Sequence, residues 1–302
     1  MVKRTVHFSN PAHLSTSKKQ LVVELKDEKR TQHTLPIEDL GLIVLEHPQI
    51  TFTMSLLDEL LENKVAVVTC NAKYMPNGLL LPLEGNTEQT ERMHKQIAAS
   101  VPLKKQLWQQ TIKAKIHNQM KVLEGLGGIS KRLENLRDKV ASGDSGNCEA
   151  QAASHYWGQL YGGDFVRSRE RDTPNAQLNY GYAILRSVVA RSLTASGLLP
   201  TFGIHHKNKY NAYCLADDIM EPYRPYVDWM VLHLSGIKEN DEGLTREHKI
   251  ELLKLPQLDV VINDFKRPLF HAVSMTTASL YKCFDGEMRK IHYPEFHFTN
   301  ND

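Results

Sequence analysis

The spacing of apolar residues changes partway along the chain, near residue 85. Before that point, short apolar runs rich in β-branched residues alternate with polar breaks, which predicts β-strands. One segment differs, since SLLDELLEN at 55–63 has the spacing of a helix, with Ser55 able to cap it. The predicted strands cover residues 4–8, 14–16, 20–25, 31–35, 40–45, 50–52, 65–69 and 79–83, and Asn77-Gly78 is a predicted turn before the last of them.

After residue 86, apolar residues recur at helical spacing over most of the remaining chain. In the helix predicted at 103–123, Leu107 and Trp108 belong to an apolar stripe typical of a packed core, whereas Lys115 and other lysines take the remaining positions. The other predicted helices cover 87–99, 129–140, 147–160, 175–196, 226–233, 244–255 and 266–284, and the tail 293–302 is expected to be loose. We therefore predict an α+β protein with a small N-terminal β-rich domain at 1–86 and a larger all-helical domain at 87–302.

The composition limits the class of protein but does not indicate which reaction or ligand is involved. At 41% hydrophobic residues the chain matches a soluble globular protein, and no apolar run approaches the length of a membrane span. The N-terminal MVKRTVHFSN lacks the apolar stretch of a secretory signal. The four cysteines lie far apart and form no CxxC pair, which predicts reduced, mostly buried thiols. We therefore expect a cytoplasmic protein with no membrane partner.

Charge is nearly balanced over the whole chain, but it is unevenly distributed. The formal net charge is only +2, so bulk electrostatics give no argument for nucleic acid. Between Lys95 and Lys139, however, ten lysines and arginines stand against three acids. Such a basic segment is either a solvated helical surface or a surface that contacts phosphates.

The segment 203–225, GIHHKNKYNAYCLADDIMEPYRP, gathers histidines and acids over a short distance. Asp218 and Glu221 are three residues apart, so on a helix they share a face. His205 and His206 follow a glycine, from which one imidazole can reach that face. Imidazole nitrogen together with carboxylate oxygen is a ligand set for a divalent metal. The alternative is a loop followed by an amphipathic helix whose acids complement its positive N-terminus.

A third acid, Glu149, stands in the first turn of the helix predicted at 147–160. It either complements the helix dipole or faces a site, since the small residues around it allow another element to approach closely. Ser145 or Asn147 is the expected cap of this helix. Its expected apolar stripe consists of Ala150, Ala153, Trp157 and Leu160.

Three separated motifs point to one known family. They are CEAQAASHYW around Glu149, the helix start NAQLNYGYAIL, and the segment 203–225. In this order, behind a small β-rich domain, they resemble the CRISPR-associated spacer integrase family, the universal adaptation proteins that insert new spacers into CRISPR arrays. The resemblance covers essentially the whole chain, and IMEPYRP together with the sequence around the histidines looks most like the type II form.

The resemblance implies a divalent metal, Mg²⁺ or Mn²⁺, held by a glutamate, a histidine and a second acid. By position these ligands are Glu149, His206 and Glu221, and Asp218 joins them as a catalytic residue beside the metal. The second histidine of the pair is implied because the family histidine lies three residues after the glycine and twelve before the aspartate. Asp217 is expected to be a cap or a surface acid.

The implied activity is DNA strand transfer, in which the 3′-hydroxyl of an incoming fragment attacks a phosphodiester of the repeat. The implied partners are double-stranded DNA, a second copy of the chain, and a small ferredoxin-like CRISPR-associated subunit that completes a heterohexamer; a type II effector nuclease is a further candidate. The β-rich domain is the dimerisation candidate, and the helical domain carries metal and DNA. The DNA-binding candidates are Lys104, Lys105, Lys113, Arg167, Lys207 and Arg224.

Two other interpretations stay open at this point. The same ligands with water as nucleophile would make a metal-dependent nuclease that cuts branched DNA during repair. A structural metal cluster would make a DNA scaffold without enzymatic activity. Asn175, Asn179 and Tyr182 also occupy family-typical positions, where packing is the simpler role.

Overall fold

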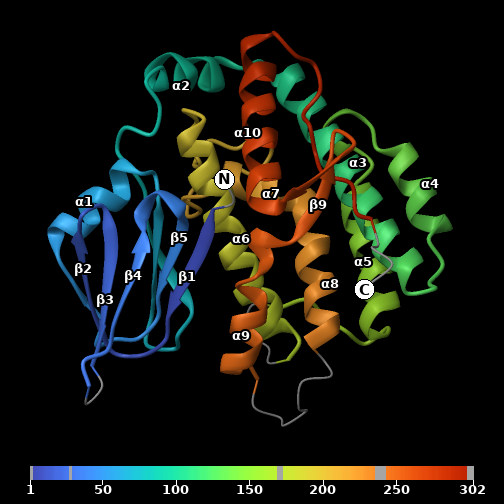
Figure 1. Cartoon of the computed structure of the whole chain (residues 1–302). Coiled ribbons are helices and arrows are strands. Elements are labelled where there is room, and N and C mark those ends of the chain that lie inside the picture. The colour runs from blue at the N-terminus through green and yellow to red at the C-terminus, as the bar shows by residue number, and fades with distance from the viewer. Residues whose placement is uncertain (1–2, 27–28, 169–172, 235–242, 298–302) are drawn as a thin grey trace. The chain divides into compact units, whose positions relative to one another are not determined.

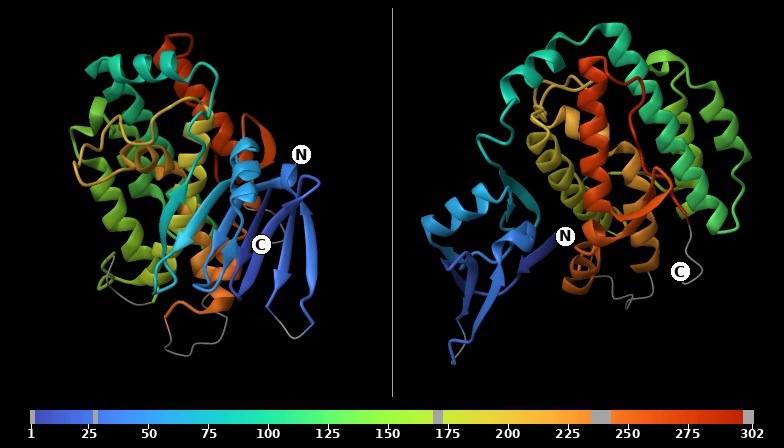
Figure 2. Two further views of the ribbon diagram at one scale, coloured as in Figure 1. Left: turned by 90° about the vertical axis from the view of Figure 1, so that its left-hand side faces the viewer. Right: turned by 45° about the horizontal axis from the view of Figure 1, so that its top comes forward.

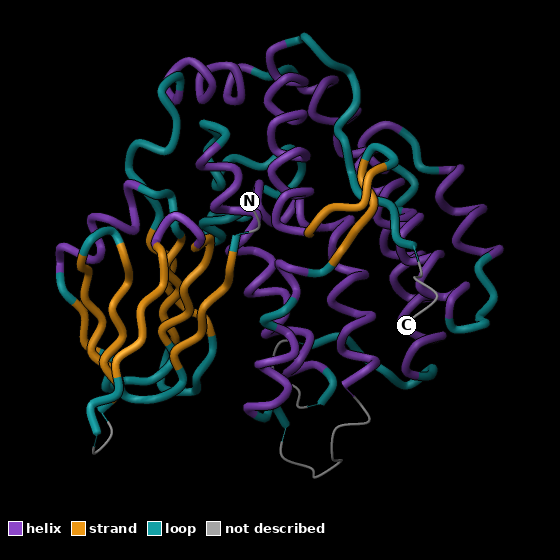
Figure 3. Tube along the Cα trace, in the orientation of Figure 1, coloured by secondary structure: helices purple, strands orange, loops and turns teal. Residues whose placement is uncertain are grey.

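The structure, a computed structural model, describes residues 3–26, 29–168, 173–234 and 243–297 (Figure 1). The chain forms two compact units, Met1–Thr87 and Glu88–Asp302. Figures 2 and 3 show that strands are concentrated in the first unit and helices in the second. The predicted α+β class, with a β-rich region followed by a helical one, is confirmed.

The first unit contains two four-stranded sheets. In one, the order is β1 (Arg4–Phe8), β5 (Leu40–Leu45), β7 (Ala66–Cys70) and β8 (Pro76–Leu80). Its first three strands run parallel, and β8 is antiparallel to β7. The other sheet has the order β4 (Gln32–Pro36), β3 (Gln20–Leu25), β2 (Ala12–Ser17) and β6 (Thr51–Phe52). β1, β3 and β5 have the predicted bounds, because each combines β-formers with a polar break on both sides.

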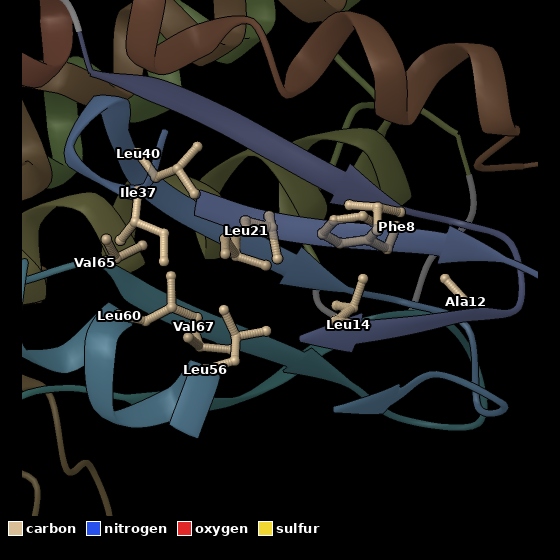
Figure 4. Close-up of a cluster of buried hydrophobic side chains, with 12 residues drawn as sticks. Phe8, Ala12, Leu14, Leu21, Ile37, Leu40, Leu56, Leu60, Val65 and Val67 are labelled. Atoms are coloured by element: carbon tan, nitrogen blue, oxygen red, sulfur yellow. The ribbon is translucent and has the colours of Figure 1, made fainter. Parts of the chain in front are cut away.

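The core of the first unit lies between these strands and α1 (Met54–Glu62), as Figure 4 shows. Leu56 and Leu60 lie one helical turn apart on α1 and are buried in the cluster. β5 is buried along nearly its whole length, which explains its continuous apolar run. The cap of α1 is Thr53, whose side chain accepts from the Leu56 amide at 3.3 Å, so the predicted cap at Ser55 is wrong.

The last predicted strand of this unit is shifted. Asn77 and Gly78 lie inside β8, where a turn was predicted, and Gly78 pairs with Thr69 of β7. A side chain at Gly78 would clash with Thr69 on the neighbouring strand. Glycine is required here for close packing between strands, which the sequence pattern alone does not separate from a turn.

In the second unit, two long helices, α3 and α6, contact most of the others. α3 packs against α4, α5, α7 and α8, and α6 packs against α7, α8, α9 and α10. The helices are α2 (Gln89–Ala98), α3 (Val101–Gly125), α4 (Lys131–Lys139), α5 (Cys148–Tyr161), α6 (Asn175–Ala195), α7 (Cys214–Met220), α8 (Arg224–Leu234), α9 (Arg246–Leu252) and α10 (Leu269–Asp285). No helix in the described ranges has both the length and the apolar character needed to cross a bilayer.

The prediction that this unit is all-helical is wrong in one place. Strands β9 (Asp259–Ile262) and β10 (Phe265–Pro268) form an antiparallel hairpin, and its turn uses left-handed backbone at Asn263 and Asp264. Pro268 then precedes α10, which starts three residues later than predicted.

The segment after α10 is fixed along α3. The side-chain amide of Gln110 exchanges hydrogen bonds of 2.9 Å with the backbone at 289–291, and Asn118 exchanges bonds of 3.0 Å with the backbone at 294–296. The expectation of a loose tail is therefore wrong for 293–297, and 298–302 lies outside the described residues.

Candidate active site

Lys115 stands at the centre of a buried charged cluster in the second unit. α3 presents it on the core side, where only 8% of the residue is exposed. Its Nζ lies 2.7 Å from Oε1 of Glu149 and 2.6 Å from Oε2 of Glu221. Burial disfavours the ammonium, yet Glu221 and Glu149 hold the pKa of Lys115 above its usual value. The prediction that grouped Lys115 with lysines outside the core is wrong.

Glu221 is positioned by a break in a helical run. α7 ends at Met220, a tight turn covers Glu221–Tyr223, and α8 follows directly. Pro222 in this turn lacks a backbone N–H, so the regular helical hydrogen bonding cannot continue through it. Oε1 of Glu221 forms an ion pair with Nε of Arg224 at 2.9 Å. Burial opposes ionisation of Glu221, but Arg224 and Lys115 outweigh it and hold its pKa well below the usual range.

Asp218 organises the two histidines. Its carboxylate is fully buried and accepts from the backbone N–H groups of His205 at 2.9 Å and His206 at 3.2 Å. Oδ1 also lies 2.5 Å from Nδ1 of His206. A Cβ on Gly203 would lie 2.5 Å from the His206 carbonyl oxygen and 2.6 Å from Oδ2 of Asp218, so only glycine fits the inside of this turn.

The two histidines have different surroundings. The His205 ring stacks on the Trp108 indole, with ring centres 4.1 Å apart and planes within 2°. The His206 ring meets the same indole edge-on at 5.7 Å. The hydrogen bond to Asp218 raises the pKa of His206 more than burial lowers it, and the charges of Glu221 and Glu149 act in the same direction. Burial instead lowers the pKa of His205.

Glu149 is held at the start of α5. The cap of this helix is Asp144, whose carboxylate accepts from the backbone N–H of Cys148 at 2.9 Å and of Glu149 at 3.0 Å. The predicted cap at Ser145 or Asn147 is therefore wrong, since Asn147 has left-handed backbone and no capping bond. The predicted apolar stripe of α5 is also wrong, because the buried residues are Cys148, Ala152 and Tyr156.

The chemistry of this donor set fits a divalent cation. Glu149, Glu221 and His206 offer two carboxylates and an imidazole, and the ammonium of Lys115 stands between the carboxylates as a cation. Within the described residues, no three His, Cys, Asp or Glu side chains are gathered as a ready metal-binding group. Metal ligation by the three expected residues therefore stays a prediction.

Asp217 is neither a surface acid nor a helix cap. It is 6% exposed, and its carboxylate accepts from Nε of Arg186 and from the Asn211 side chain, both at 2.7 Å. Through Asp217, these bonds join α6 to the loop that leads from the turn carrying His205 and His206, here called the histidine turn, to α7.

A second buried network lies beside the site. Arg167 donates to Asn175 at 2.9 Å and to Asn179 at 2.8 Å. Its guanidinium and that of Arg224 both lie over the Tyr182 ring, and the Tyr182 hydroxyl donates to Asp228 at 2.5 Å. Burial raises the pKa of Asp228 to about 7. Both arginines thus make internal bonds, and their predicted DNA contacts stay untested.

The remaining DNA-binding candidates are exposed or partly exposed lysines. Lys207 is exposed next to His206, and Lys104 and Lys105 lie near the start of α3. Lys113 borders a pocket of about 490 Å³ between α3 and the segment 289–295. Three cations around it have no carboxylate partner within the described residues, and we call them the outer basic cluster: Lys113, Arg289 and Lys290.

Comparison with known proteins settles the family. The sequence profile of the family described as CRISPR associated protein Cas1 matches residues 6–254. The chain belongs to the Cas1 family. A CRISPR-associated endonuclease Cas1 from Neisseria meningitidis serogroup C (strain 8013) is 40% identical over 256 residues, which cover 84% of this chain and 83% of that relative. The family indicated by the three sequence motifs is thereby confirmed.

Solved structures share the Cas1 fold of this chain. A casposase bound to an integration product has a TM-score of 0.81 at 18% identity, covering 98% of this chain and 95% of that chain. A Cas6-RT-Cas1–Cas2 complex contains a chain with a TM-score of 0.72 at 21% identity, covering 95% of this chain and 35% of that chain.

The structure brings only some of the motif residues of this Cas1 chain into direct contact. The structure joins Glu149 to Glu221 through Lys115, and it joins His206 to Asp218. Sequence reasoning missed Lys115 and Trp108 as parts of the site. Their only signal was position, because they lie seven residues apart and therefore share one face of α3.

Proposed function

We propose that this Cas1-family chain is a divalent-metal-dependent DNA integrase. The 3′-hydroxyl of a short DNA fragment attacks a phosphodiester of a CRISPR repeat, a new P–O bond forms, and the repeat strand's own P–O3′ bond breaks to leave a free 3′-hydroxyl. The chain acts in the cytoplasm. The observation that carries the proposal is the meeting of Glu149 and Glu221 on one buried cation beside the His206–Asp218 pair. The names of the relatives support it, since one is an endonuclease and another was solved with an integration product.

The side chains of the site have separate tasks. Glu149, Glu221 and His206 would hold Mg²⁺ or Mn²⁺, which supplies a Lewis acid for the phosphate and for the hydroxyl that attacks it. Asp218 binds Nδ1 of His206, which leaves Nε2 as the nitrogen that would ligate the metal. Arg224 keeps Glu221 ionised and fixes its orientation. No protein nucleophile is needed, because the DNA fragment carries its own.

Spacer insertion needs two strand transfers at a fixed separation, so one assembly must hold two sites. We propose a homodimer formed through the N-terminal β-rich unit, joined by a small ferredoxin-like subunit into a heterohexamer. The Cas2 component in the name of one structural relative supports such a partner, and a type II effector nuclease is a further candidate. Lys207 and the outer basic cluster would contact DNA phosphates, which makes binding salt-sensitive and nearly independent of sequence.

A strand-transfer assay tests the proposal. A labelled short duplex is incubated with a plasmid that carries the repeat, in Mg²⁺, in Mn²⁺ and in EDTA. Covalent joining that requires a divalent ion is the expected result. Cleavage without joining would indicate the branched-DNA nuclease, and neither activity would indicate the scaffold.

Matched variants assign the residues. We expect Glu221→Gln and His206→Ala to abolish joining, whereas His205→Ala retains most of it because its ring packs on Trp108. Glu251→Gln is the control, since this partly exposed acid pairs with Lys254 and with no other cation among the described residues. If Glu221→Gln still joined the DNA strands, the assignment of Glu221 as a metal ligand would be wrong. If His205→Ala and His206→Ala exchanged their effects, the histidine assignment would be wrong while the integrase assignment stands.

A further inference from the structure

The metal assignment leaves Lys115 without a role, although its position is costly. Lysine is almost never fully buried unless it is paired, and here its ammonium is paired twice. Glu149 comes from α5 and Glu221 from the turn before α8, so the ammonium links two elements that are far apart in the sequence. The formal charges of the cluster cancel, since Lys115 and Arg224 face the two carboxylates.

The same ammonium sets the spacing of the two carboxylates. Two negative charges brought together in a buried site repel strongly, because little solvent screens them. Lys115 offsets that repulsion and keeps one oxygen of each glutamate at hydrogen-bond distance from a single point. A divalent ion held by both glutamates would compete with the ammonium for the space between them.

We propose that Lys115 is an internal counter-cation that holds Glu149 and Glu221 together in the metal-free enzyme, and that its ammonium leaves this position when a divalent ion binds. The inference rests on the proposed metal dependence. An ammonium and a divalent ion cannot share the space between two carboxylates, because the two cations repel. The flexible four-carbon stem of lysine lets the ammonium move away without displacing α3.

This arrangement has a thermodynamic consequence. A site that must first release a bound group can bind its ligand only in the fraction of molecules from which that group has left. The apparent affinity for the ligand is lowered in proportion to that fraction. The intact enzyme therefore binds metal more weakly than its ligands alone allow. In exchange, the two glutamates are already aligned when the metal arrives.

Metal binding without turnover tests the proposal. Titration calorimetry with Mn²⁺ is performed on the full chain and on Lys115→Met, which keeps an unbranched side chain one atom shorter and removes the charge. We expect binding to tighten about tenfold or more in Lys115→Met, since no cation has to leave. Lys115→Arg keeps a cation and should not tighten binding. Lys121→Met is the matched control on the same helix, where the lysine pairs with Glu124 near the surface.

A second measurement uses the unaltered protein, in case Lys115→Met does not fold. Lysine amines are labelled with acetic anhydride and quantified by mass spectrometry, in EDTA and in saturating Mn²⁺. Labelling of Lys115 should rise several-fold with Mn²⁺, whereas labelling of Lys131, 73% exposed, should not change. Unchanged labelling of Lys115 while calorimetry records bound Mn²⁺ would overturn the inference.

The outcomes separate this inference from the proposed function. If the unaltered protein binds Mn²⁺ and Glu221→Gln abolishes binding, the metal assignment holds. Equal or weaker binding by a folded Lys115→Met then refutes the counter-cation alone. Absence of Mn²⁺ binding in both proteins refutes the counter-cation and the metal-dependent integrase together.

Discussion

Asp218 is fully buried and binds three nitrogen atoms of the histidine turn, so Asp218→Asn removes one charge without changing the size of the side chain. Hydrogen bonds to a charged partner contribute about 1.5–3 kcal/mol each. Asparagine still accepts through its carbonyl oxygen, but its NH₂ group faces a donor, so at least one bond is lost. We expect the free energy of unfolding to fall by about 2–4 kcal/mol.

The same substitution changes the titration of His206. The hydrogen bond to Asp218 raises the pKa of this imidazole in the folded protein. The resulting stabilisation is complete below the unfolded pKa of about 6.5 and is lost as pH rises through the higher folded value. Asp218→Asn should therefore destabilise the protein more at about pH 5.5 than at about pH 8.5, and it should lower the pKa of His206.

Urea unfolding at both pH values and NMR titration of the histidine ring measure these effects, with EDTA present throughout. Asp217→Asn is the control, because this neighbouring buried acid binds Arg186 and Asn211 and no histidine. It should destabilise the protein and leave the pKa of His206 in place. The reasoning fails if Asp218→Asn lies within about 0.5 kcal/mol of the unaltered protein, or if the pKa of His206 is the same in both.

Three further predictions concern other parts of the second unit. Because burial raises the pKa of Asp228 to about 7 in the folded state, the free energy of unfolding should fall as pH rises from about 4 to about 7. Asparagine cannot ionise, so the free energy of unfolding of Asp228→Asn, measured in urea, should fall less over this range. An equal fall in both proteins would contradict the assignment. Gly181→Ala should cost about 1–3 kcal/mol in thermal unfolding, because the added Cβ clashes with Val227; a neutral result would disprove this close packing. Replacing all three cations of the outer basic cluster with glutamine should weaken the binding of duplex DNA and make it less dependent on salt. The slope of the logarithm of the binding constant against the logarithm of the salt concentration should fall in magnitude by about 0.9 for each lost phosphate contact. An unchanged slope, with Mn²⁺ binding intact, would exclude this cluster as a DNA-binding surface.

The sequence predicted most elements because their patterns are local. β5 is a short apolar run and α6 is a long periodic segment that ends before Gly197, and both appear where expected. The hairpin β9–β10 was missed because its strands are only four residues long and β10 runs directly into α10. The break at Pro222 was visible as a motif, but its effect on Glu221 depends on three-dimensional packing.

The site was predictable only in part, for a physical reason. The acids and histidines stand out because few residue types bind metals, and the family resemblance selected among them. Nothing in the sequence distinguished Lys115 in this way, since a lysine within a basic helix is usually solvated. Its burial follows from the two glutamates, and the sequence does not reveal that distant carboxylates will neutralise it. The same applies to the Tyr182–Asp228 pair.

The glutamates and the histidine turn reach the site from three separated segments, and all of them rest on α3. No contiguous fragment of the second unit shorter than the span from α3 to α8 contains every group. A nascent chain released before the turn at Glu221–Tyr223 lacks one of the two carboxylates that Lys115 joins, so its site is incomplete. If the chain is the integrase proposed above, strand transfer would have to wait until synthesis has passed Glu221, so the order of these segments would keep unfinished chains inactive.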